Sequence, residues 1–104
     1  MKKIEAAAQT CRRQNNYKLS GQIYEDSGDI GSAAKDYCEG KLHEDALRCY
    51  TQIGDEPWMA RVYERMKEFD KALAIWKKLG KAREVSRVSK KKEKTMAKKQ
   101  LKLF

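Results

Sequence analysis

Residues 24–76 read YEDSGDIGSAAKDYCEGKLHEDALRCYTQIGDEPWMARVYERMKEFDKALAIW, with a large aromatic residue at every thirteenth position. This aromatic column consists of Tyr24, Tyr37, Tyr50, Tyr63 and Trp76. A second column keeps the same spacing and consists of small or apolar residues: Gly21, Ala34, Leu47, Ala60 and Leu73. Two columns with the same 13-residue spacing indicate an internal repeat, which has to be recognised before any other pattern is interpreted.

The apolar pattern within each 13-residue step is that of a helix. Ala46, Leu47 and Tyr50 stand at i, i+1 and i+4, which is one side of a helix. Glycines suited to left-handed turns recur every 26 residues, at Gly28, Gly54 and Gly80. We therefore predict helices near residues 3–13, 17–26, 30–38, 43–52, 56–66, 69–79 and 82–90.

Helices this short do not persist alone in water, so they have to be held by stacking on their neighbours. We expect an all-α fold of short antiparallel helix hairpins, with a 26-residue repeat, stacked as an α-solenoid. The aromatic column shares its side of each helix with Ala and Leu, so it should form the core rather than stack on exposed bases. The repeat domain should cover residues 1–88, followed by a basic, flexible tail at residues 89–104 that is either a helix extension or disordered.

Two segments resemble tetratricopeptide repeats (TPR), in which small residues let paired helices approach and an aromatic residue closes each helix. They are ARVYE, at residues 60–64, and FDKALAIWKKLG, at residues 69–80. The resemblance covers roughly residues 17–88, although the 26-residue period is shorter than that family's period of about 34. It implies a TPR-like scaffold that binds a protein partner on its helical face. An α-solenoid outside the TPR family, as in coat and transport scaffolds, is equally compatible with the sequence.

The net charge of +9 belongs to one part of the sequence. Residues 1–76 hold 12 Lys and Arg against 13 Asp and Glu, whereas residues 77–104 hold 12 against 2. Because basic side chains neutralise phosphates, this segment predicts non-specific, salt-sensitive contact with DNA or RNA. The candidate contact residues are Lys90, Lys91, Lys92, Lys94, Lys98 and Lys99. The alternative is a solvated linker that binds nothing.

The last five residues, Gln100-Leu101-Lys102-Leu103-Phe104, resemble the peptide by which bacterial replication and repair proteins dock on the β sliding clamp. The usual form is Gln-Leu-Ser/Asp-Leu-Phe, so Lys102 alone departs from it, at the most permissive position. The resemblance implies clamp docking through Gln100, Leu101, Leu103 and Phe104. It also implies the C-terminal part of a DNA replication or repair protein, such as a helicase. The alternative is that Leu101 and Phe104 complete an amphipathic helix.

Sequence patterns typical of catalysis or metal binding are missing. His43 is the single histidine, so neither a Ser-His-Asp nor a Cys-His arrangement is supported. Cys11, Cys38 and Cys49 are too widely spaced for a zinc site, and we predict buried, reduced thiols. Acidic pairs such as Glu25-Asp26 fall at helix ends, where capping or solvation explains them better than catalysis. We expect no enzyme activity, no cofactor and no metal.

The sequence also bears on location and partners. No apolar run approaches the roughly 18 residues that span a bilayer, and the N-terminus has no apolar signal core. We expect a cytoplasmic protein with no membrane partner. The sequence predicts a protein-interaction module that docks on a sliding clamp and holds a second protein on its helical face. The alternatives are a general TPR-like scaffold and an electrostatic nucleic-acid binder.

Overall fold

The computed structural model describes the backbone of residues 2–102 and the side chains of residues 3–98. This part of the chain consists of helices joined by short turns and contains no strand. The helices are α1 (Lys2–Arg13), α2 (Tyr17–Asp26), α3 (Ile30–Glu39), α4 (His43–Ile53), α5 (Glu56–Arg65), α6 (Phe69–Lys78) and α7 (Ala82–Lys102). The all-α prediction is confirmed, and the bounds of the first six helices agree with the predicted bounds to within one residue.

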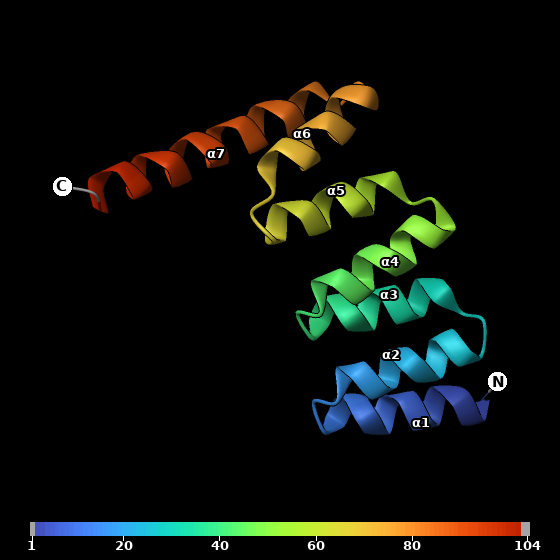
Figure 1. The fold of residues 1–104 in the computed structure, drawn as a ribbon. Coiled ribbons are helices and arrows are strands. Elements are labelled where there is room, and N and C mark those ends of the chain that lie inside the picture. Colours follow the sequence, from blue (N-terminus) through green and yellow to red (C-terminus); the bar gives the residue numbers. More distant parts are fainter. Residues whose placement is uncertain (1, 103–104) are drawn as a thin grey trace. The chain divides into compact units, whose positions relative to one another are not determined.

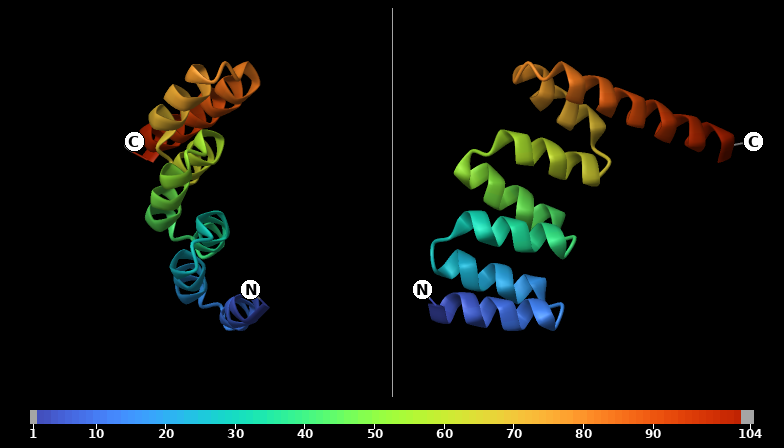
Figure 2. Two further views of the ribbon diagram at one scale, coloured as in Figure 1. Left: turned by 90° about the vertical axis from the view of Figure 1, so that its right-hand side faces the viewer. Right: turned by 180° about the vertical axis from the view of Figure 1, so that it is seen from behind.

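The chain divides into two compact units, one that ends at Asp55 and one that begins at Glu56. Helices α1 to α4 form the first unit, and α5 to α7 form the second. Within each unit every helix packs antiparallel against the next one along the chain, as Figure 1 and Figure 2 show. This is the stacking of short hairpins that the two sequence columns predict. That residues 1–88 unfold as one cooperative domain stays a prediction.

Each turn between consecutive helices contains one residue with a left-handed backbone. These residues recur every 13 positions, with φ between 58° and 88°: Asn15, Gly28, Lys41, Gly54, Lys67 and Gly80. The glycines confirm the predicted turns, because glycine adopts this region without a steric penalty. Asparagine and lysine take the same conformation in the alternate turns at a steric cost, so the glycine pattern revealed only every second turn.

Local side-chain chemistry explains where helices begin and how closely they approach. Asn16 and Asp29 cap α2 and α3, because each side chain accepts a hydrogen bond at 3.2 Å from a backbone N–H three residues later. Gly21 in α2 allows α3 to come close, since a Cβ at this position would overlap the ring of Tyr37. The small residue and the aromatic residue of the two columns are therefore packed against each other.

The aromatic column lies in the core. Four of its members, Tyr24, Tyr37, Tyr50 and Trp76, are between 2% and 6% exposed, whereas Tyr63 is half-buried. In the second unit the buried cluster consists of Ala60, Ala72, Trp76 and Val88. All three cysteines are buried and form no disulfide, as predicted.

Helix α7 is longer than predicted. The sequence predicts a helix near residues 82–90, followed by either a helix extension or a disordered tail. The described backbone continues as helix to Lys102. The regular apolar spacing ends at Val88, but lysine, glutamate, methionine and alanine all favour helix without any apolar face. Lys92 also pairs with Asp70 of α6, which ties this part of α7 to its neighbour. None of the described helices is both long enough and apolar enough to cross a membrane.

Candidate functional site

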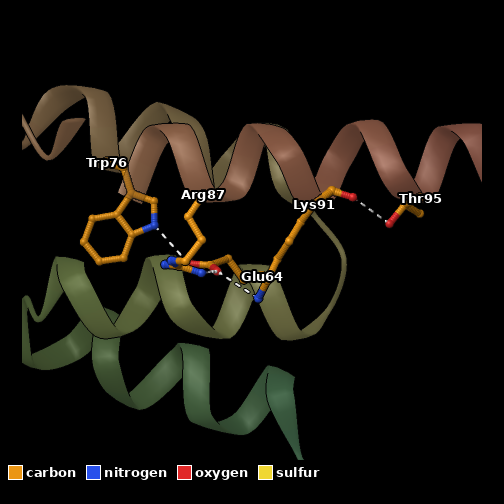
Figure 3. A network of polar contacts seen from close by, with 5 residues as sticks. All are labelled: Glu64, Trp76, Arg87, Lys91 and Thr95. Atoms are coloured by element: carbon orange, nitrogen blue, oxygen red, sulfur yellow. Dashed lines mark hydrogen bonds and ion pairs between the residues drawn. The ribbon is translucent and has the colours of Figure 1, made fainter. Parts of the chain in front are cut away.

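Helix α7 carries most of the residues to which the sequence assigns function, and a polar network fixes its position in the second unit (Figure 3). Glu64 of α5 accepts a hydrogen bond from Trp76 Nε1 of α6 at 3.0 Å and one from Arg87 Nη2 of α7 at 3.1 Å. The ammonium of Lys91 lies 3.8 Å from the same carboxylate. One acidic side chain, only 7% exposed, thus joins three consecutive helices.

The charge of Glu64 is maintained despite its burial. Burial by itself raises the pKa of this carboxyl group, but hydrogen bonds from Arg87 and Trp76 outweigh it and hold the pKa below its usual range. Glu64 is therefore ionised at neutral pH. It compensates the charge of Arg87 and part of that of Lys91.

The first unit contains the same arrangement 39 residues earlier, three steps of the 13-residue repeat. Tyr37 donates its hydroxyl hydrogen to Glu25 at 2.6 Å, and Arg48 donates two hydrogen bonds to the two Glu25 oxygens, at 2.7 and 2.9 Å. The network therefore occurs in both units, at equivalent steps of the repeat, and is not specific to α7. The sequence predicts a capping or solvated role for Glu25, and these contacts correct that prediction. The signal that identifies it is an acid, an aromatic and an arginine at i, i+12 and i+23.

The basic residues of α7 gather on one side of the helix. At about 100° per residue, six of them fall within roughly 100° of arc, and they extend over about 22 Å of helix. We call these six the basic stripe: Arg83, Arg87, Lys90, Lys91, Lys94 and Lys98. The acidic residues of α7, Glu84 and Glu93, fall outside this arc. With Ser86, the five stripe residues other than Lys98 line an open depression on the surface.

The basic stripe separates the predicted nucleic-acid contacts into two groups. Lys90, Lys91, Lys94 and Lys98 belong to it. Lys92 lies on the opposite side and pairs with Asp70, and the side chain of Lys99 is outside the described residues. Arg83 and Arg87 lie in the same basic segment but are not among the predicted contact residues; the helical spacing, continued backwards from Lys90, identifies them.

The cations of the basic stripe differ in how far they are compensated. Arg87 and Lys91 face Glu64. The other four form no ion pair with a described side chain: Arg83, Lys90, Lys94 and Lys98. These four positive charges are therefore available to an external anion.

The predicted docking peptide comes shortly after the basic stripe in the sequence. The backbone of Gln100 and Leu101 continues α7, but their side chains, and Leu103 and Phe104 entirely, lie outside the described residues. The docking interpretation requires an extended peptide, in which Leu101 and Leu103 project to the same side. Since the backbone is helical through Lys102, extended docking requires the end of α7 to unwind, which helix ends do at low cost.

Other reactive groups contribute little to the site. Among the described residues, no three His, Cys, Asp or Glu side chains gather into a metal-binding cluster. Burial raises the pKa of Cys49 to about 11, so its thiol stays protonated at neutral pH and is a poor nucleophile. Comparison with models of protein families, with curated proteins and with solved structures finds no match to the chain. Its function is therefore inferred from its own residues.

Proposed function

We propose that this chain is a protein-interaction module that docks on a bacterial sliding clamp through the peptide Gln100-Leu101-Lys102-Leu103-Phe104. The observation that carries the proposal is the match of this peptide to the clamp-docking pattern at Gln100, Leu101, Leu103 and Phe104. In this proposal the chain is the cytoplasmic, non-enzymatic C-terminal part of a DNA replication or repair protein, such as a helicase. The TPR-like helical repeats hold a second protein partner.

The length of α7 supports an accessible peptide. Val88 is the last buried residue among the described side chains of this helix, and the peptide begins twelve residues later. At 1.5 Å per residue, this places its start about 18 Å along the helix from the core. A clamp can therefore reach the start of the peptide without displacing any buried residue among the described side chains.

The strength expected of such docking is modest. Burying Leu101, Leu103 and Phe104 in clamp pockets contributes about 5–9 kcal/mol before costs are counted. Fixing five residues, and unwinding the end of α7 first, takes back a large part of this. We expect a dissociation constant in the micromolar range, which corresponds to a binding free energy of about −8 kcal/mol at most.

The test is direct titration of a purified bacterial clamp with the whole chain. We expect saturable binding that Leu103→Ala combined with Phe104→Ala abolishes, because this variant removes two of the three apolar anchors. Lys102→Ser, which restores the usual residue at the permissive position, is the matched control and should bind at least as well. Thermal unfolding of both variants should match the parent.

Absence of saturable binding at about 50 µM clamp would contradict the proposal and leave a general TPR-like scaffold as the better interpretation. A pull-down that compares the whole chain with a chain lacking residues 100–104 separates the two. Partners lost on truncation belong to the peptide, and partners retained belong to the helical repeats.

A further inference from the structure

We infer that the basic stripe of α7 is a binding surface for the phosphate backbone of duplex DNA. This goes beyond clamp docking, since it involves other residues and another ligand. It also refines the sequence prediction of a lysine-rich tail, because it assigns contact to one side of a formed helix. The residues that carry it are the uncompensated cations Arg83, Lys90, Lys94 and Lys98.

The arrangement of charge is the first argument. Four uncompensated cations are spread over about 22 Å on one side of a rigid rod, with both acidic residues of the helix outside their arc. A linear array of this kind faces several phosphates at once, and each contact releases counterions from the DNA. Because the helix is already formed, binding does not have to order the backbone, as it would with a flexible tail.

The network around Glu64 is the second argument. It holds Arg87 and Lys91 toward α5, as Figure 3 shows, and so fixes which side of α7 faces the other helices of the second unit. Lys90 and Lys94, at neighbouring positions of the stripe, are exposed. The stripe is therefore held in one orientation by contacts that use only two of its six cations.

The other residues of α7 and the width of the helix indicate which polyanion binds the stripe. Helix α7 has no aromatic residue, so it offers no platform for stacking unpaired bases. Among its described apolar residues, Val85 and Val88 pack in the core of the second unit, and Met96 is the single exposed large one. The helix therefore lacks the continuous apolar side that binds a lipid bilayer. An α-helix about 10–12 Å wide fits the major groove of B-form DNA but not the narrow major groove of duplex RNA. These features favour duplex DNA.

The experiment is titration of a labelled DNA duplex of about 20 base pairs with the whole chain at several salt concentrations. The stripe variant carries Lys90→Gln, Lys94→Gln and Lys98→Gln. The matched control carries Lys3→Gln, Lys18→Gln and Lys35→Gln at exposed positions of α1, α2 and α3, which removes the same charge elsewhere. Circular dichroism confirms that both variants keep their helices.

We expect the stripe variant to bind DNA at least about tenfold more weakly than the parent near 100 mM salt. The slope of log K against log salt concentration should be smaller in magnitude by about 2 to 3. The control should lose less than about twofold. Equal loss in both variants would overturn the inference, since net charge alone would then explain binding. Equal affinity of parent and stripe variant would overturn it too.

Two further measurements complete the test. A duplex RNA of the same sequence should bind more weakly than the DNA, and equal or tighter binding would overturn the assignment to DNA. The Leu103→Ala, Phe104→Ala variant should bind DNA like the parent. Loss of DNA binding in this variant would show that the peptide, not the stripe, makes the contact, whereas failure of clamp docking leaves the DNA result unaffected.

Discussion

Single residues in the turns show that the repeat determines their backbone conformation. Asn15, Lys41 and Lys67 adopt the left-handed backbone that glycine adopts in the alternate turns. A residue with a Cβ is strained by about 1–2 kcal/mol in this region. The stacking of the flanking helices outweighs this strain, so the geometry of a turn is set by the repeat and not only by its own residue.

Replacing Lys67 by glycine should therefore stabilise the protein. Glycine removes the strain but costs about 0.5–1 kcal/mol of additional chain entropy, so we expect a net gain of about 0.5–1 kcal/mol in the free energy of unfolding. Chemical denaturation measures it. Lys67→Ala is the control, because it removes the same side chain but keeps the Cβ. If both variants unfold at the same denaturant concentration, the turn is not strained.

At the scale of the helix, the bounds of α1 to α6 could be predicted because their signals are local. The glycine turns and the apolar columns lie within a few residues of the helix ends that they determine. The end of α7 could not be predicted from apolar spacing, because the helix continues beyond Val88, where that spacing ends. The basic stripe became visible only when the helix was known to continue.

The acid, aromatic and arginine networks were missed for a different reason. Glu25 and Glu64 lie in the last turn of α2 and α5, where an exposed carboxylate is usually solvated, and their true partners are 12 and 23 residues away. Such partners come together only after the helices stack. Spacing at i, i+12 and i+23 is a signal for these contacts only when a 13-residue repeat is already known.

The network in the first unit predicts a specific loss of stability in acid. Hydrogen bonds from Arg48 and Tyr37 lower the pKa of Glu25 to about 2 in the folded protein, against about 4.5 in the unfolded chain. A lowered pKa means that the stabilisation is complete above pH 4.5 and is lost as pH falls from there toward 2. The contribution is at most about 3 kcal/mol.

Thermal unfolding of the parent and of Glu25→Gln across this range measures the effect. The parent should unfold at a higher temperature than the variant above pH 4.5. This difference should shrink as pH falls and vanish near pH 2. Glu44→Gln, at an exposed acid near the start of α4, is the control for general titration. Parallel curves for parent and Glu25→Gln would show that this carboxylate does not contribute to folding.

At the scale of the molecule, the question is whether the two compact units need the distal part of α7. A chain that ends at Val88 keeps every buried residue of the described part but loses the pairs of Lys91 with Glu64 and of Lys92 with Asp70. Exposed ion pairs contribute about 0–1 kcal/mol each. We expect the truncated chain to unfold in one transition, with a free energy of unfolding lower by at most about 2 kcal/mol.

Denaturation followed by circular dichroism distinguishes the outcomes. The helical signal of the truncated chain should fall only by the share of the residues removed. A larger fall, or a broad transition in place of a sharp one, would show that residues beyond Val88 are part of the folding unit.

The even spacing of the left-handed turns limits how a chain of this kind changes its length. A helix rotates about 100° per residue, so one residue inserted before Tyr50 inside α4 would turn the ring away from its neighbours. An inserted block of 26 residues, bounded by two glycine turns, would leave every later residue in register. A gene that encodes such a protein therefore tolerates the duplication or loss of 26 consecutive codons better than the gain or loss of a single codon.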